Sequence, residues 1–154
     1  MRPVSGTRIV AVLSGNGTIS TQEAPIPNLT SGMVQISVEA SLVSPGTEIG
    51  GWDQLAEQLA RKLEPRDPQP FGYSAAGVVA AVGEGVTEFT PGQRVAAVGA
   101  GYALHSNVVV VPHHLCVAVP DSVPSSDAAY AMLLATAAHA VRRGSPALGE
   151  NWLV

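Results

Sequence analysis

Alternation of apolar and polar residues dominates the first two thirds of the chain. The clearest case is VQISVEASLV (34–43), in which every second residue is apolar. A period of two places the apolar side chains on one face of a β-strand and the polar ones on the other. Short apolar runs bounded by turn residues predict further strands at 7–13, 74–83, 93–99, 107–112 and 115–120.

Two stretches follow a helical period instead. GWDQLAEQLARKLEP (51–65) spaces its large apolar residues three or four apart, which predicts a short amphipathic helix. From Ser125 onward, SSDAAYAMLLATAAHAVRRG predicts one continuous terminal helix, with Ser125 as its N-cap and Gly144 at its end. Mostly short strands, one inserted helix and a terminal helix together favour a mainly β fold that is closed or nearly closed.

Composition supports one folded domain. The chain has 154 residues, of which 46% are hydrophobic and 13% charged, and its 16 glycines and 12 prolines suit many turns. A net charge of −4 without basic runs argues against nucleic-acid and membrane-surface partners. The sequence also lacks an apolar run long enough to span a membrane, and its single cysteine excludes an internal disulfide. We therefore expect a soluble cytoplasmic protein.

Several segments, in order, resemble one family. FGYSAAGVVAAVGEGVTEFTPGQRV (71–95) resembles the G-H-E-x-x-G-x-V-x-x-V-G-x-x-V-x-x-x-x-x-G-D-R-V run of the medium-chain dehydrogenase/reductase superfamily, with Gln93 in place of the Asp. PGTE (45–48) resembles that family's C-G-T-D turn, and ATAAHAVRRG (135–144) resembles the helix that leads toward its cofactor domain. The resemblance is to the N-terminal GroES-like catalytic domain and covers nearly the whole chain.

The resemblance implies a fold and an activity. The fold would be mainly β, a GroES-like, partly open β-barrel with a short inserted helix and a C-terminal helix, spanning 1–154. The activity would be that of an NAD(P)-dependent, alcohol dehydrogenase-like oxidoreductase acting on a small-molecule carbonyl, alcohol or activated double bond. GENWLV (149–154) resembles the first strand of the Rossmann cofactor domain, whose phosphate-binding turn is absent. We expect that domain as a partner, and no NAD or NADP bound by this chain alone.

The family's catalytic zinc ligands fall on unsuitable residues here. By resemblance they correspond to Pro45, Tyr73, Ser74 and either Ala131 or Met132, none of which supplies a thiolate, imidazole or carboxylate. The sequence therefore predicts a zinc-independent branch with no metal site. A rival hypothesis is a metalloenzyme that uses His113, His114 and Cys116, the last two on one face of a strand.

The resemblance also assigns candidate site residues. Thr47 would bond the substrate oxygen and relay its proton, while Glu48 occupies the acidic position of the turn. Tyr73 would either donate a hydrogen bond to a developing oxyanion or fill the space of the lost zinc. The remaining candidates are Ser44, Trp52 and Ser74 for the substrate, and Gly46 and Thr136 for the cofactor.

The residues alone allow plainer roles for the same positions. PGTE could be a turn that starts a helix, Trp52 could pack that helix, and Thr136 could bond back to a helix carbonyl. His105 and His139 are expected at the surface or in packing. A stand-alone binding or assembly module without redox activity remains the alternative function. We also expect the exposed surface of the terminal helix and of the SPGTE turn (44–48) to be unusually apolar, and self-association or a partner through that surface.

Overall fold

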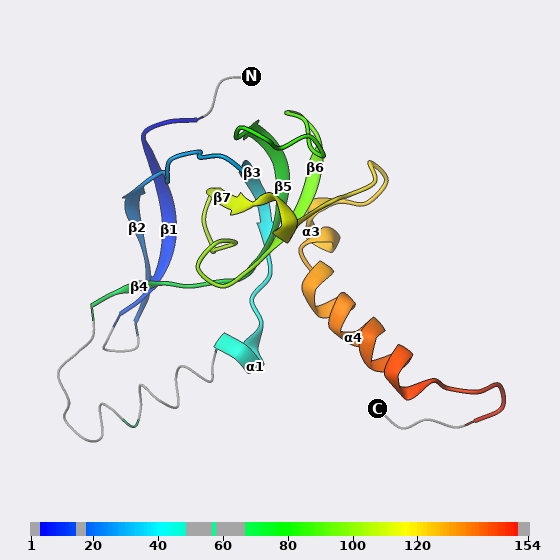
Figure 1. Ribbon diagram of the computed structural model, residues 1–154. Coiled ribbons are helices and arrows are strands. Elements are labelled where there is room, and N and C mark those ends of the chain that lie inside the picture. Colours follow the sequence, from blue (N-terminus) through cyan, green and yellow to red (C-terminus); the bar gives the residue numbers. More distant parts are fainter. Residues whose placement is uncertain (1–3, 15–17, 49–56, 58–66, 151–154) are drawn as a thin grey trace.

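The computed structural model describes residues 4–14, 18–48, 57 and 67–150, which form two antiparallel sheets (Figure 1). The smaller sheet has the order β2-β1-β4 and the larger the order β7-β3-β5-β6-β8. The strands are β1 (Thr7–Leu13), β2 (Ile19–Pro25), β3 (Met33–Ser41), β4 (Gln69–Pro70), β5 (Ser74–Val82), β6 (Arg94–Val98), β7 (Val108–Pro112) and β8 (Cys116–Ala118). The helices are α1 (Pro45–Glu48), the 3-10 helix η1 (His113–Leu115), α3 (Ser125–Ala128) and α4 (Ala131–Gly144).

The six strands predicted from apolar patterning are confirmed, and β5 lies at the centre of the larger sheet. Seven of its nine residues are buried. β3 and β6 flank its two edges, and the side chains of two core clusters cover its faces. The main core gathers Val34 and Ile36 of β3, Val79 of β5 and Val95 of β6, together with valines of β7. Burial of these branched side chains stabilises the larger sheet.

Strand β3 shows where the alternation holds and where it fails. From Ile36 to Ser41 the apolar residues are buried or half-buried and the polar ones exposed, as predicted. Gln35 is the exception, since only 1% of it is exposed although the pattern puts it on the wetter face. Its side-chain amide pairs with the backbone of Val4, accepting from the N–H at 2.7 Å and donating to the carbonyl at 2.8 Å. These bonds satisfy the buried amide.

The segment 105–107 joins the two sheets. On one side, Ala11 of β1 donates its N–H to the carbonyl of His105 at 2.8 Å, and Asn107 donates to Ile9 at 3.2 Å. On the other side, Val38 of β3 donates to the carbonyl of Asn107 at 2.9 Å. The described residues form no closed barrel, and the arrangement agrees with the expected GroES-like, partly open β fold.

The apolar pattern of the sequence did not predict the strands β2 and β4. All residues of β2 except Ala24 are exposed, because β2 is an edge strand that pairs only with β1. An edge strand with solvent on both faces has no apolar period to detect. Strand β4 has only two residues, Gln69 and Pro70, which pair with the end of β1.

The predicted terminal helix is interrupted, which corrects the expectation of one continuous helix. α3 ends at Ala128 and α4 begins at Ala131. Ser125 is not an N-cap: Pro124 holds that position, and the Ser125 hydroxyl donates to the Glu39 carboxylate. Gly144 is still helical, and Ser145 adopts the left-handed conformation that ends α4, with φ of 50°. The predicted helix at 51–65, with Trp52, lies outside the described residues.

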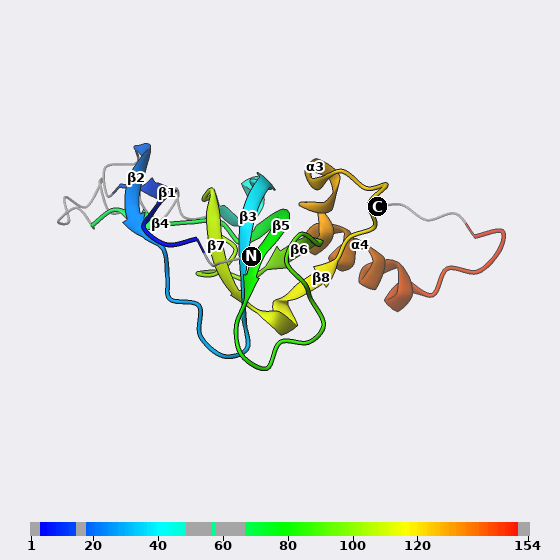
Figure 2. The same cartoon turned by 90° about the horizontal axis from the view of Figure 1, so that it is seen from above.

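Helix α4 extends away from the sheets in both views (Figures 1 and 2). Every one of its residues after Ala131 is exposed, including Met132, Leu133, Leu134 and Val141. The expected apolar exposed face is therefore present on this helix. Within the described residues, none of the helices is both long and apolar enough to cross a membrane.

Candidate functional site

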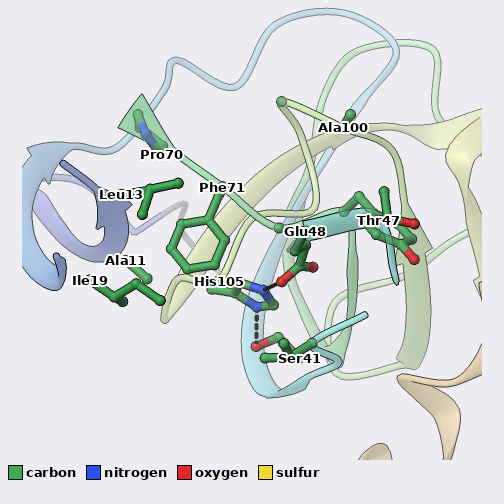
Figure 3. Close-up of a pocket in the computed structure, with 14 residues that line it drawn as sticks. Ala11, Leu13, Ile19, Ser41, Thr47, Glu48, Pro70, Phe71, Ala100 and His105 are labelled. Carbon is green, nitrogen blue, oxygen red and sulfur yellow. Dashed lines mark hydrogen bonds and ion pairs between the residues drawn. The ribbon is translucent and has the colours of Figure 1, made fainter. Parts of the chain in front are cut away.

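A cavity of about 680 Å³ opens between the smaller sheet, α1 and the loops that follow β4 and β6 (Figure 3). Its wall is mostly apolar, and Figure 3 shows Leu13, Ile19, Pro70 and Phe71 grouped on one side. Polar groups enter the same lining from three segments: Ser41, Thr47, Glu48, Tyr73 and His105. A concave apolar cavity with a few convergent polar groups is typical of a small-molecule site.

The turn SPGTE forms the short helix α1 at the rim of this cavity. The Ser44 carbonyl accepts the N–H groups of Thr47 at 3.2 Å and Glu48 at 2.9 Å, which closes the turn. The Ser44 hydroxyl donates to the Thr47 hydroxyl at 3.5 Å, at the long end of hydrogen-bond distances. The turn thus has the helix-starting role that the residues alone suggested. It also brings Thr47 and Glu48 to the cavity that Tyr73 lines.

His105 connects α1 to the end of β3. Its Nε2 lies 3.2 Å from Oε2 of Glu48, and its Nδ1 lies 2.9 Å from the Ser41 hydroxyl, as Figure 3 shows. The side chains of His105 and Glu48 are 9% and 11% exposed. An ion pair or charge-assisted hydrogen bond that is this well covered is screened by solvent less than a surface pair.

The backbone fixes the His105 ring in this position. His105 donates its N–H to the Phe71 carbonyl at 3.0 Å, and the Phe71 ring meets the imidazole edge-on with centroids 5.0 Å apart. Gly72 adopts a φ of 108°, and a Cβ at this position would lie 2.5 Å from the backbone nitrogen of His105. Only glycine fits both the positive φ and the close approach.

His105 is the site residue that the sequence did not reveal. The expectation of a surface or packing residue omits its place in the cavity lining and its bond to Glu48. The two residues are 57 positions apart, and no local motif links them. The available signal was the run of three polar residues from His105 to Asn107, which separates the apolar residues 102–104 from β7.

Other candidate residues lie away from the cavity lining. Ser74 is buried, and its hydroxyl donates to the Ala129 carbonyl at 2.7 Å. Thr136 is exposed on α4 and donates to the Met132 carbonyl at 3.1 Å, the plainer of its two expected roles. Gly46 is exposed in α1, where an added Cβ would meet no atom within 4 Å. The surface at Gly46 is therefore open.

The donor set does not fit a catalytic zinc. The positions that resemble the family's ligands hold Pro45 in α1, Tyr73, Ser74 and the first residues of α4. In the part of the chain that the structure describes, no three His, Cys, Asp or Glu side chains gather as a metal site would need.

The structure does not place His114 and Cys116 as the rival metal hypothesis requires. His113 and His114 lie in η1 and not on a strand, so His114 and Cys116 do not share a strand face. The chain leaves β7 at Pro112 and turns through a 3-10 helix, which the apolar pattern did not indicate. His113 Nδ1 instead faces the exposed Glu88 carboxylate at 3.3 Å.

Comparison with known proteins gave consistent matches. A model of the alcohol dehydrogenase GroES-like domain matches residues 30–121. Sorbitol dehydrogenase of Mus musculus is 26% identical over 181 residues, covering 99% of this chain and 49% of that protein. Erythronolide synthase EryA2 of Saccharopolyspora erythraea is 34% identical over 133 residues, covering 83% of this chain and 3% of that protein.

The fold also matches solved structures. The quinone oxidoreductase from Coxiella burnetii superposes with a TM-score of 0.74 over 94% of this chain and 47% of that one, at 19% identity. Identity this low supports the fold alone. The chain spans less than half the length of each of these three proteins.

Proposed function

The chain belongs to the alcohol dehydrogenase GroES-like domain family, and from this premise we propose that it forms the substrate-binding part of a zinc-independent, NAD(P)-dependent oxidoreductase. Its domain is of the oxidoreductase type found in the medium-chain dehydrogenase/reductase superfamily. The proposed substrate is a small molecule with a carbonyl group or an activated double bond. The proposed partner is a Rossmann cofactor domain, contributed by the same polypeptide or by another.

One observation carries this proposal: the hydroxyl-bearing residues Thr47 and Tyr73 line the same largely apolar cavity. The apolar wall would bind the carbon skeleton of the substrate and exclude water from the reacting bond. Hydrogen bonds from the two hydroxyls would stabilise negative charge that develops on the substrate oxygen, which is the task a zinc ion performs in other family members. A bound nicotinamide would supply the hydride.

The relatives support the reaction class. Sorbitol dehydrogenase of Mus musculus, named above, is a dehydrogenase by name and matches almost the whole of this chain. The donor set described above favours chemistry without zinc. Gly46 and Thr136 are both exposed, and they would border a cofactor that the proposed Rossmann domain mainly holds.

Hydride transfer by this chain together with its cofactor domain, on whichever polypeptide that domain lies, tests the proposal. We expect NADH or NADPH oxidation with a member of a panel containing an aldehyde, an enone and a quinone. Tyr73→Phe and Thr47→Val should each lower kcat/KM about 100-fold, since each removes one hydrogen-bond donor to the developing oxyanion. Tyr130→Phe, at an exposed tyrosine outside the cavity lining, should leave it unchanged.

Two results would contradict this function. Zinc near one atom per chain by elemental analysis, with activity lost on chelation, would remove the zinc-independent mechanism. Quinones or aldehydes that bind in the cavity by NMR without any turnover would favour the alternative of a binding module.

A further inference from the structure

Ser41, His105 and Glu48 form a continuous hydrogen-bonded line in the cavity wall (Figure 3). Ser41 closes β3, Glu48 closes α1, and His105 comes from the loop before β7. The imidazole thus uses both nitrogens, one on the hydroxyl and one on the carboxylate. Neither the proposed oxyanion stabilisation by Tyr73 nor that by Thr47 requires this line.

The arrangement suits a group that holds a proton. An imidazole can gain and lose a proton near neutral pH, and the Glu48 carboxylate, 3.2 Å from Nε2, can accept the proton that this nitrogen carries. Glu48 lies in the cavity lining beside His105, at 11% side-chain exposure. A proton on Nε2 of His105 would therefore be one hydrogen bond away from a carboxylate that faces the substrate space.

The Ser41 contact sets which nitrogen can exchange that proton. If Nδ1 keeps its hydrogen and donates it to the Ser41 hydroxyl at 2.9 Å, then Nε2 is the nitrogen that gains and loses a proton toward Glu48. Phe71, Gly72 and the backbone bond from His105 hold the ring in this orientation. A ring fixed by its neighbours at one nitrogen is a common way to make the other nitrogen the active one.

We propose that Glu48 is a catalytic residue and that Ser41 and His105 are positioning residues, the three together storing the proton that the substrate oxygen takes up. This rests on the proposed function. A second cavity of about 350 Å³ shares Ser41 and His105 with the first. Among the described residues, the other titratable groups that line these two cavities are Tyr73 in the first and Glu39 in the second.

The proposed step balances as follows. A reduced nicotinamide, bound by the cofactor domain, would supply the hydride for a new C–H bond, and the displaced π-electron pair would move onto the substrate oxygen. The proton on Nε2 of the His105 imidazolium passes to the Glu48 carboxylate, and the substrate oxygen forms its O–H bond with the proton that Glu48 gives up. Glu48 is then a carboxylate again, and His105 is a neutral imidazole with its hydrogen on Nδ1. Solvent entering the cavity after product release restores the proton to Nε2 through Glu48.

Turnover of an aldehyde and an enone by this chain together with its cofactor domain tests whether these three residues supply the proton. His105→Gln can still form hydrogen bonds but cannot hold the proton, so we expect kcat to fall about 10- to 100-fold with KM little changed. Glu48→Gln should lower kcat by a similar factor, because an amide cannot pass on the proton. In His105→Ala, added imidazole should restore part of kcat. His139→Gln, on the exposed part of α4, is the matched control.

Nitrogen-15 NMR of the 154-residue chain tests, without turnover, which nitrogen of His105 carries the hydrogen. We expect neutral His105 to carry its hydrogen on Nδ1 and Ser41→Ala to weaken that preference, with exposed His139 as the reference histidine in the same spectra. Neutral His105 with its hydrogen on Nε2 would overturn the proposed store. So would an active wild type whose His105→Gln variant keeps kcat within about twofold, although the proposed function would then stand. A wild type that transfers no hydride to any substrate of the panel overturns both.

Discussion

At the scale of single residues, the candidate site consists of contacts between residues that lie far apart in the sequence. His105 meets Glu48 from 57 positions away and Ser41 from 64. Gly72 makes this possible, because a side chain at its φ of 108° would collide with the His105 backbone. Thr47 and Tyr73 reach one cavity only because α1 and the segment after β4 close on the same space.

Cys116 gives a prediction of low reactivity. Burial raises the pKa of its thiol to about 12, and its sulfur lies 3.7 Å from the Pro112 carbonyl. The thiolate is the reactive form, so iodoacetamide at pH 8 should label the native chain more than about 100-fold more slowly than the chain unfolded in guanidinium. Mass spectrometry of timed samples measures this, and equal rates would contradict it.

The same pKa shift sets a direction for stability. The folded state favours the neutral thiol, so its pKa is higher in the folded chain than in the unfolded one. The contribution of Cys116 is complete below the ordinary thiol pKa and is lost as pH rises from about 9 toward about 12. In Cys116→Ala, the free energy of unfolding should therefore depend less on pH over this range.

At the scale of elements, tertiary contacts interrupt a helical pattern that the sequence carries unbroken. α3 and α4 are separated at Ala129 and Tyr130, and the Ser74 hydroxyl of β5 binds the Ala129 carbonyl there. Ala128 and Ala129 pack against Ala76 of β5 and Ala96 of β6. The small side chains let this junction approach the sheet closely, and the buried hydrogen bond holds it there.

Ser74→Ala should destabilise the protein through this junction. The change leaves the buried Ala129 carbonyl without its side-chain donor, which costs about 1–3 kcal/mol. For a chain of this size we expect the Tm to fall by roughly 2–4 °C for each kcal/mol, measured by circular dichroism. Ser126→Ala, at an exposed serine of α3, should change the free energy of unfolding by less than about 0.5 kcal/mol. Equal effects of the two changes would exclude the proposed role of Ser74.

At the scale of the whole molecule, the described chain has a packed β part and an unpacked helix. The two sheets contain the cores, and the cavity opens between the smaller sheet, α1 and the neighbouring loops, while α4 extends away with its apolar residues exposed (Figures 1 and 2). Leu134 and Val141, for example, are 61% and 58% exposed. Apolar groups gathered on one element favour association, since association removes them from water.

We expect the 154-residue chain to self-associate through α4 as its concentration rises. Leu134→Glu should weaken the association, because the new carboxylate would have to be desolvated in the interface. His139→Glu adds a charge to the same helix without removing an apolar contact, and should weaken it less. Sedimentation velocity over a range of concentrations distinguishes the variants. A wild type that stays monomeric at every concentration would rule out this use of the helix.

The sequence by itself determined the β architecture and the family. The strand patterns at 34–43 and 74–83 correspond to buried strands, because a period of two records which face meets the core. The motif at 71–95 identified the domain through spaced glycines and valines, two of which, Gly72 and Gly77, leave no room for a Cβ. Such local constraints remain visible in one dimension.

Only the tertiary structure decided the edge strand β2, the break between α3 and α4, and the place of His105. β2 is defined by its partner β1 and not by an apolar face, and the break depends on a hydrogen bond to a strand 55 residues away. The Ser41–His105–Glu48 line depends on chain closure that brings β3, α1 and the loop before β7 together. The energies of such long-range contacts depend on three-dimensional proximity, so a local sequence pattern does not reveal them.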